Sequence, residues 1–155
     1  EGLSEEKART AFDQVALRPG TGGVIEALAS AGVYTAILTG GFERGVESAL
    51  EAEGVDVDTL IANRLPVVDG ALTGEVEGPL IEGTKDDALD VLTTVVGEPM
   101  EETVAVGDGA NDLPMLEAAG LAVGFSPKPA VEPACDVVVE SMEGLLDVLE
   151  SRGIV

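Results

Sequence analysis

Short apolar runs alternate with helical patterns along most of the 155 residues. Runs such as Val33–Leu38 and Val104–Val106 have the length and the β-branched content of strands that are buried on both faces. Glycines close several of the helical segments, as Gly32 and Gly54 do. Strand and helix in alternation predict βαβ units with right-handed crossovers. The chain is therefore expected to have an α/β fold built on a parallel sheet.

Local patterns place the individual elements. The expected helices are Ser4–Val15, Thr21–Ala31, Phe42–Glu53, Thr84–Val96, Asp112–Ala119 and Ser141–Ser151. The expected strands are Val33–Leu38, Thr59–Asn63, Thr103–Val106, Leu121–Phe125 and Asp136–Val139. Thr39-Gly40-Gly41 is expected to be a turn between a strand and a helix. Asp69-Gly70 lies between two short apolar runs, which is a strong signal for a β-hairpin.

The charge balance is extreme, with 8 Lys and Arg against 30 Asp and Glu, a net charge of −22. A basic surface for DNA or RNA is thereby excluded, and so is attraction to anionic lipid. Acidic runs such as Glu98–Glu102 are interpreted as solvated surface. High salt screens the self-repulsion of such a chain, which favours the cytoplasm of a halophile, although an ordinary acidic protein is the alternative.

The aromatic, cysteine and hydropathy content indicates the make-up of the core and the cellular location. Aromatic residues make up only 3% of the chain, so the core must be built from Val, Leu, Ile and Ala. Cys135 is the single cysteine and the chain has no His, so Cys135 is expected to be buried filler rather than a catalytic thiol. There is no apolar run of about 18 residues and no signal peptide, so a cytoplasmic protein is expected. The start at Glu1 within a helical pattern indicates truncation, although processing would look the same.

Two strand ends and one lysine carry the candidate chemistry. In Leu38–Phe42, the Thr39 hydroxyl and two glycines precede a helix, an arrangement suited to binding a phosphate, although a plain turn with Thr as a cap is the alternative. In Gly107–Asp112, two carboxylates and an amide lie close together at a strand end. This pattern favours a Mg²⁺ site over the alternative, an ordinary helix N-cap. Lys85 lies at a helix start, where a cation is disfavoured unless it has a task such as neutralising phosphate; a surface lysine is the alternative. Together these features describe phosphoryl transfer.

In this order and spacing the features resemble the haloacid dehalogenase superfamily. Its motif two is a Ser or Thr at a strand end, here Thr39, and its motif three is a helix-borne lysine, here Lys85. Its motif four is a strand followed by an acidic loop, here Gly107–Asp112. Longer stretches resemble the phosphoserine phosphatase family within it, and the resemblance covers roughly Arg18 to Val155. These stretches are Leu38–Phe42, Ile61–Leu65, Leu72–Val76 and Val104–Asp112.

The resemblance implies a Rossmann-type three-layer sandwich with a β-hairpin insertion. It also implies Mg²⁺-dependent hydrolysis of O-phospho-L-serine, a small phosphomonoester, to L-serine and phosphate, the last step of serine biosynthesis. Thr39 and Gly40, with Gly41 beside them, would bind the phosphate, and Lys85 would neutralise the phosphoryl group and hold the nucleophile. Thr39 departs from the Ser that many members have, but the hydroxyl is retained. In the acidic loop, Asp108 would ligate Mg²⁺.

The same resemblance assigns the rest of the loop and reveals a departure. Asn111 would help to position the substrate, and Asp112 would support the metal shell and the motif-three lysine. The family's motif one, Asp-x-Asp-x-Thr, whose aspartates serve as nucleophile and as general acid and base, does not occur in the sequence. Residues 1–16 are expected to be the end of a cap domain, and residues 17–155 an incomplete core.

Family topology places the missing motif-one strand between the strands that carry Thr39 and Asp108. The chain alone is therefore expected to be inactive and poorly stable, with exposed strand edges. Two alternatives stay open. One is a phosphatase for another small phosphomonoester, because the missing cap selects the substrate. The other is a non-catalytic phosphate- or metal-binding fragment, or half of a split enzyme.

Overall fold

The computed structural model describes residues 2–82 and 84–155. Residues 2–82 and 149–155 form one compact unit, and residues 84–148 form the other. The last helix, α6 (Met142–Ser151), begins in the second unit, and from Leu149 onward it is grouped with the first. Among the described residues, no helix has the length and the apolar content that crossing a lipid bilayer requires.

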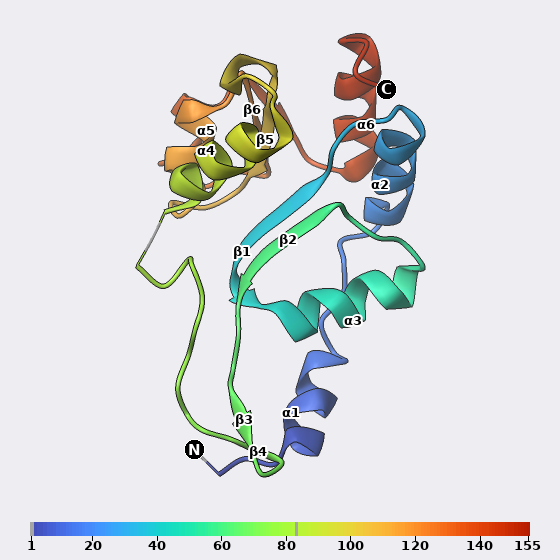
Figure 1. The fold of residues 1–155 in the computed structure, drawn as a ribbon. Helices are drawn as coiled ribbons and strands as arrows, with labels where there is room; N and C mark the ends of the chain where they lie inside the picture. Colours follow the sequence, from blue (N-terminus) through green and yellow to red (C-terminus); the bar gives the residue numbers. More distant parts are fainter. Residues whose placement is uncertain (1, 83) are drawn as a thin grey trace. The chain divides into compact units, whose positions relative to one another are not determined.

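The first unit is built on a two-stranded parallel sheet. Its elements are α1 (Glu5–Phe12), α2 (Thr21–Ser30), β1 (Ala36–Phe42), α3 (Glu43–Glu53), β2 (Thr59–Asn63), β3 (Val67–Val68) and β4 (Ala71–Leu72). Strands β1 and β2 run side by side, and α3 packs against both of them (Figure 1). Helix α1 packs against α3 in turn. The assignment of residues 1–16 to a cap domain stays a prediction.

Strand β1 differs from the sequence prediction at both ends. It begins at Ala36 rather than Val33. The N–H of the preceding residue, Thr35, donates to the Asp58 carboxylate at 2.7 Å, although its carbonyl accepts the Thr59 N–H at 3.1 Å. The strand continues through Thr39-Gly40-Gly41, so the prediction of a turn there is wrong. The register passes from Leu38↔Ile61 to Phe42↔Asn63, four steps on β1 against two on β2. The two extra residues form a bulge, and pairing with β2 resumes beyond it.

Helix α1 is shorter than predicted, since it ends at Phe12 rather than Val15. The chain leaves the helix at Asp13, whose carboxylate accepts a hydrogen bond from the Ser48 hydroxyl of α3 at 3.1 Å. Val15 then packs against the backbone of α3, because a Cβ on Gly45 would lie 3.0 Å from its Cγ2. A tertiary contact therefore overrides the local helical pattern here.

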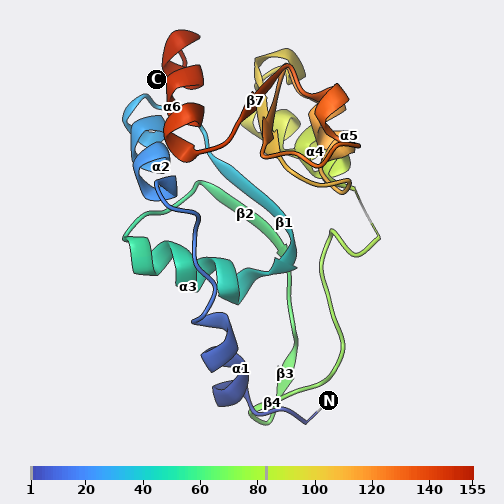
Figure 2. The same ribbon diagram turned by 180° about the vertical axis from the view of Figure 1, so that it is seen from behind.

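The predicted hairpin is confirmed. Strands β3 and β4 pair antiparallel, and Asp69 and Gly70 between them have φ values of 51° and 76°. Positive φ at both central residues is the signature of a type I′ turn. The segment before α1 lies along β4, through a bridge between Ser4 and Ala71 (Figure 2).

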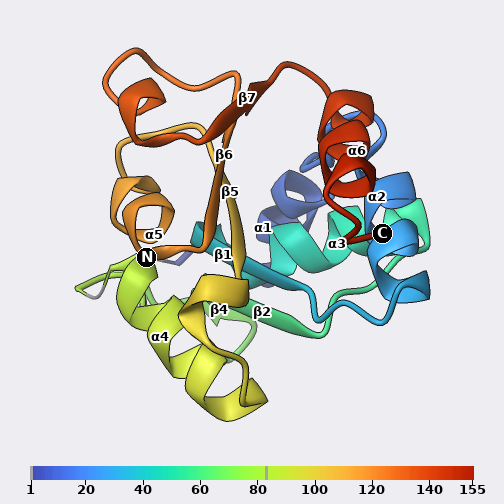
Figure 3. The same ribbon diagram turned by 90° about the horizontal axis from the view of Figure 1, so that it is seen from above.

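The second unit contains a three-stranded parallel sheet in the order β5-β6-β7. Its elements are α4 (Lys85–Val96), the 3₁₀ turn η1 (Met100–Glu102), β5 (Val104–Gly107), α5 (Leu113–Ala118), β6 (Leu121–Phe125), the 3₁₀ turn η2 (Glu132–Ala134), β7 (Val137–Val139) and most of α6. Helix α5 packs against β5 and β6, and α4 packs against α5 (Figure 3). Every residue of β6 is buried, as expected for the middle strand of a covered sheet.

The fold class is confirmed as α/β with parallel sheets. Among residues 2–82 and 84–155, seventeen hydrophobic side chains are buried, and all but Phe125 and Met115 are Val, Leu, Ile or Ala, as the scarcity of aromatic residues predicted. In the described part of the chain, β1 pairs only with β2, and β5 pairs only with β6. Each of these two strands therefore has one edge without a partner strand among the described residues.

Replacing Val by Ala at a buried position and at an exposed position tests how much burial in the core contributes to stability. Val123, in β6, is 0% exposed, and Val95, in α4, is 77% exposed. We expect Val123→Ala to lower the free energy of unfolding by about 2–3 kcal/mol, because it removes two buried methyl groups and leaves a cavity. Val95→Ala should change it by no more than about 0.5 kcal/mol. Urea denaturation followed by circular dichroism measures both, and equal losses would contradict this core.

Candidate functional site

The acidic loop after β5 folds around the carboxylate of Asp112. That side chain is only 6% exposed, and its Oδ2 accepts hydrogen bonds from the backbone N–H groups of Asp108, at 2.9 Å, and Gly109, at 3.0 Å. Gly107 makes room for it, since a Cβ there would lie 2.5 Å from the Asp112 Cβ. A side chain at position 107 would therefore push the carboxylate out of the loop.

Lys85 and Asp112 form an ion pair of 2.5 Å between Nζ and Oδ1. The lysine is the first residue of α4 and its side chain is 12% exposed, so both charges are largely removed from water. The helix start is held by Thr84, whose hydroxyl donates to the Asp87 carboxylate at 3.1 Å. Lys85 thus lies against the helix dipole because its ammonium has a buried carboxylate partner, a contact that the family resemblance implied.

Burial by itself raises the pKa of Asp112. The hydrogen bond from Lys85, those from the N–H groups of Gly109 and Asp108, and the charge of Lys85 outweigh it, and the pKa of Asp112 lies below its usual value. Asp112 is therefore a charged, buried anchor.

Asp108 and Asn111 lie on the exposed side of the same loop. The backbone of Asp108 is fully used, since its N–H binds Asp112 and its carbonyl accepts from the Lys128 N–H at 3.0 Å. Its carboxylate makes no hydrogen bond or ion pair with any other described residue. The Asn111 amide lies over Gly109, where a Cβ would be 2.8 Å from its Oδ1. The loop thus presents one unpaired carboxylate and one amide to solvent.

Hard oxygen donors of this kind fit Mg²⁺, which keeps several water ligands and needs only one or two protein carboxylates. Asp108 fits as a direct ligand, because its backbone is fixed and its carboxylate is unpaired. Asp112 as a ligand stays a prediction: three of the roughly four acceptor positions of its carboxylate already hold hydrogen bonds. In the described ranges, no cluster of three or more His, Cys, Asp or Glu side chains is arranged to hold a metal ion.

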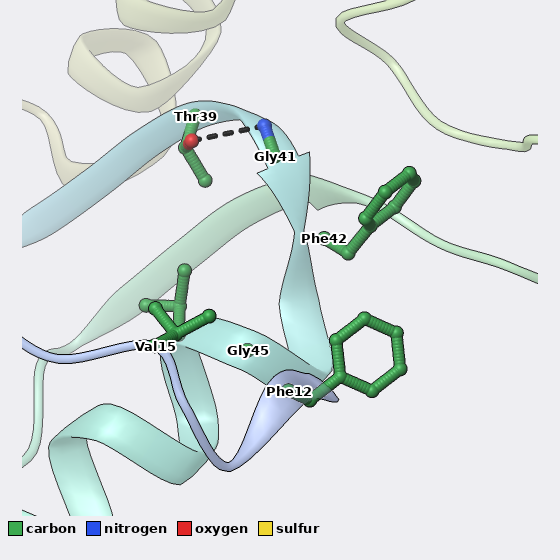
Figure 4. A pocket seen from close by; sticks show the side chains of 7 residues that line it. Phe12, Val15, Thr39, Gly41, Phe42 and Gly45 are labelled. Atoms are coloured by element: carbon green, nitrogen blue, oxygen red, sulfur yellow. Dashed lines mark hydrogen bonds between the residues drawn. The ribbon is translucent and has the colours of Figure 1, made fainter. Parts of the chain in front are cut away.

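In the first unit, the bulge of β1 presents a hydroxyl and two exposed glycines. The Gly41 N–H donates to the Thr39 Oγ1 at 3.0 Å (Figure 4). Because that oxygen accepts the N–H, the hydroxyl hydrogen remains available to donate to another acceptor. The first turn of α3 follows at once, and Phe42 at its N-cap supplies no side-chain hydrogen bond. A hydroxyl beside uncapped helical N–H groups is suited to an anion.

A pocket of about 270 Å³ opens beside this bulge. The rings of Phe12 and Phe42 meet edge to face, with centroids 6.2 Å apart. Figure 4 shows the Thr39 hydroxyl bonded to Gly41 and the two rings at the other end of the group. The remaining lining residues are Val15, Gly45 and Val46. Apart from the hydroxyl, the side chains that line the pocket are apolar, so Thr39 supplies its polar side-chain group.

The structure therefore brings Lys85, Asp108 and Asp112 together in the second unit, with Asn111 beside them. Thr39, Gly40 and Gly41 lie together in the first unit. Whether the two groups share one cleft stays a prediction. Cys135 is half-buried, and its thiol donates to the Val131 carbonyl at 3.5 Å. Burial and then the charges of Glu132 and Asp136 raise the pKa of this thiol, so it is unsuited to attack as a thiolate.

Sequence reasoning gave no function to two polar residues near these sites. The Asn63 amide donates to the Gly40 carbonyl at 3.0 Å. Lys128 has its Nζ 3.9 Å from the point that a Cβ on Gly109 would occupy. Asn63 ends the strand that pairs with β1, so a polar residue at the end of a paired strand was the available signal. Lys128 reaches the acidic loop through the fold and had no local signal.

Known proteins resemble the chain along nearly its whole length. The sequence model of the haloacid dehalogenase-like hydrolases matches residues 1–117. A phosphoserine phosphatase of Halobacterium salinarum is 51% identical over 153 residues, covering 99% of this chain and 72% of the relative. A solved phosphoserine phosphatase with bound substrate matches with a TM-score of 0.85 and 36% identity, covering 97% of this chain and 71% of the other. A phospho-aspartyl intermediate analogue of phosphoserine phosphatase matches with a TM-score of 0.83 and 37% identity, at the same coverages.

The pH dependence of stability tests the Asp112 anchor. A folded-state pKa below the unfolded value means that the carboxylate stabilises the fold above about pH 4, and that this contribution is lost as the pH falls through the folded pKa. We expect Asp112→Asn to cost about 3 kcal/mol near pH 7, because Lys85 is left buried without a counter-charge. The cost should shrink as the pH falls through the folded-state pKa of Asp112, which lies below the usual value.

Urea denaturation of the wild-type chain and the variant across this pH range measures the difference. Asp90→Asn, which neutralises an exposed carboxylate on α4, is the control, and its effect should stay within about 0.5 kcal/mol at every pH. If Asp112→Asn lowered the free energy of unfolding equally at low and at neutral pH, the stabilising role of the Asp112 carboxylate would be refuted.

Proposed function

This chain belongs to the haloacid dehalogenase-like hydrolase family, and from that premise we propose that it carries the phosphate- and metal-binding residues of a phosphoserine phosphatase. The observation that carries the proposal is the buried Lys85–Asp112 pair beside the unpaired carboxylate of Asp108. The reaction is hydrolysis of O-phospho-L-serine to L-serine and inorganic phosphate, which would serve the making of serine.

Each residue has a separate task in this proposal. Thr39 donates its hydroxyl hydrogen to one phosphate oxygen, and the N–H groups of Gly40 and Gly41 line the exposed bulge around it. Lys85 neutralises charge on the phosphoryl group, and Asp112 fixes the ammonium in place. Asn111 contacts the substrate from the outer side of the acidic loop. Positioned donors and cations of this kind are the main source of rate in phosphoryl transfer.

Asp108 holds Mg²⁺ in this proposal, and the bound ion would polarise the phosphoryl oxygens as a Lewis acid. The protein fixes the orientation of Asp108 as a metal ligand, because Asp112 binds its backbone N–H and Lys128 binds its carbonyl. Asp112 serves mainly as the anchor of this ligand and of Lys85.

The nucleophile of the proposed reaction is an aspartate outside these 155 residues, since no Asp-x-Asp-x-Thr pattern occurs among them. Its carboxylate would attack phosphorus, the serine hydroxyl would leave with a proton from a second aspartate, and water would then release phosphate from the aspartyl-phosphate. The substrate could instead be another small phosphomonoester. A panel of phosphomonoesters assayed with the complete gene product distinguishes these substrates.

Asp108→Asn tests the metal ligand with little risk to folding, because the side chain is exposed. In the complete gene product we expect it to lower kcat at least about 100-fold, since one charged ligand is lost while the loop backbone is kept. Phosphate release from O-phospho-L-serine at varied Mg²⁺ concentration measures this. Asp90→Asn, an exposed carboxylate of α4, is the matched control and should leave kcat unchanged. Normal activity of Asp108→Asn would refute the metal assignment.

We also propose that the chain works at high salt, on the strength of its net charge of −22. Raising KCl from about 0.1 M to about 1 M shortens the screening length from about 10 Å to about 3 Å. Repulsion between surface carboxylates should then weaken, and the midpoint of thermal unfolding should rise by several degrees.

Differential scanning calorimetry in a KCl series measures this midpoint. Replacing the exposed acidic side chains of Glu98, Glu101 and Glu102 by Gln removes part of the repulsion, so the triple variant should gain less from salt than the wild-type chain. A midpoint that does not change with KCl would rule out adaptation to salt.

A further inference from the structure

Asn63, the last residue of β2, is a buried polar side chain that the proposed function does not use. It is 5% exposed, and its Nδ2 donates to the Gly40 carbonyl at 3.0 Å. Its Oδ1 is buried and has no hydrogen-bond partner among the described residues. A buried acceptor without a partner costs stability, and an apolar side chain of similar size would avoid that cost. Stability alone therefore does not explain an amide at this position.

The carbonyl that Asn63 binds belongs to the same peptide group as the Gly41 N–H. A peptide group is planar and trans, so the direction of its carbonyl also sets the direction of its N–H. The Gly41 N–H donates to the Thr39 Oγ1 at 3.0 Å. The Asn63 amide and the Thr39 hydroxyl are thus connected through one peptide group, and hydrogen bonds in such a chain strengthen one another.

A peptide group between two glycines needs an outside partner to hold one orientation. Glycine adopts many backbone conformations at little cost. Nothing lies within 4 Å of the point that a Cβ on Gly40 would occupy, so neighbouring atoms do not restrict the bulge there. Among the described residues, two side chains bind this peptide group: Thr39 at its N–H, from within the bulge, and Asn63 at its carbonyl, from the neighbouring strand.

Water is kept away from the Asn63 amide by the backbone of Gly78. A Cβ on Gly78 would lie 2.7 Å from the Asn63 Cα, and Gly78 has a φ of 151°. A bridge between Arg64 and Glu77, with hydrogen bonds of 2.7 Å and 2.9 Å, brings Gly78 to this place. With water excluded from the Asn63 side chain, its N–H is directed to the Gly40 carbonyl.

The geometry points to Asn63 as a positioning residue that orients the Thr39 hydroxyl toward a phosphate oxygen. It acts through the Gly40–Gly41 peptide group and does not touch the substrate. The inference rests on the proposed phosphate-binding function of Thr39, and it gives the Ile61–Leu65 segment a task. Because the Thr39 oxygen accepts the Gly41 N–H, its hydrogen can only donate elsewhere, and Asn63 keeps that arrangement in place.

Asn63→Leu removes the donor and keeps the size of the side chain. Amide hydrogen exchange measured by NMR on the whole chain should show the Gly41 amide exchanging about ten-fold faster, since its acceptor is no longer held in line. Titration with inorganic phosphate should show binding to the Gly40 and Gly41 amides weakened by about the same factor. Thr39→Val should weaken phosphate binding too, and the double variant should bind no more weakly than Thr39→Val alone.

Leu50→Ala is the matched control, because Leu50 is buried in α3 of the same unit and makes no hydrogen bond to the bulge. It should speed exchange across the unit without singling out Gly41. Unchanged Gly41 exchange in Asn63→Leu, or additive losses in the double variant, would overturn the inference. If Asn63→Leu does not fold, Asn63→Ser gives the same comparison. If phosphate fails to perturb the wild-type amides, the proposed function falls, and the exchange data still decide what Asn63 does.

Discussion

The carboxylate of Asp112 connects two parts of the second unit, the acidic loop and helix α4. It accepts hydrogen bonds from two backbone N–H groups of its own loop and from the Lys85 ammonium at the start of α4. A buried carboxylate alone would cost several kcal/mol in lost hydration, so these partners must be present together. The arrangement in turn leaves the carboxylate of Asp108 unpaired and directed to solvent. The chemistry that the loop offers therefore depends on a residue that faces inward.

The same device recurs at the bulge of β1 in the first unit. There the acceptor is the Thr39 hydroxyl and the donor is the Gly41 N–H. In both places a side-chain oxygen binds backbone N–H groups within four residues, and glycines provide the close approach. The acidic loop follows β5, and the bulge lies near the carboxyl end of β1, the end of parallel strands where ligands of α/β proteins usually bind. Local polar contacts thus shape each loop before any ligand is present.

The sequence predicted what depends on local spacing. The acidic loop and the Asp69-Gly70 hairpin follow from residues close to one another in the sequence, whereas the Lys85–Asp112 contact, across 27 residues, was implied only by the family resemblance. The recognised family is confirmed. The turn at Thr39–Gly41 was wrong because pairing with Asn63, 21 or more residues away, draws the glycines into a strand. Asn63 itself received no function, since its task depends on which strand β1 pairs with. Contacts that depend on which strands pair cannot be predicted from a local sequence pattern.

The bulge also limits how the chain can change in length. Four steps on β1 stand against two on β2, so the excess is an even number of residues. Side chains alternate between the two faces of a strand, and an even excess leaves Leu38 and Phe42 on the face they would have without it. Loss or gain of a single residue there would turn the Phe42 ring away from Phe12, whereas changes in pairs would keep the ring contact. Insertions and deletions in this segment should therefore be tolerated only two at a time.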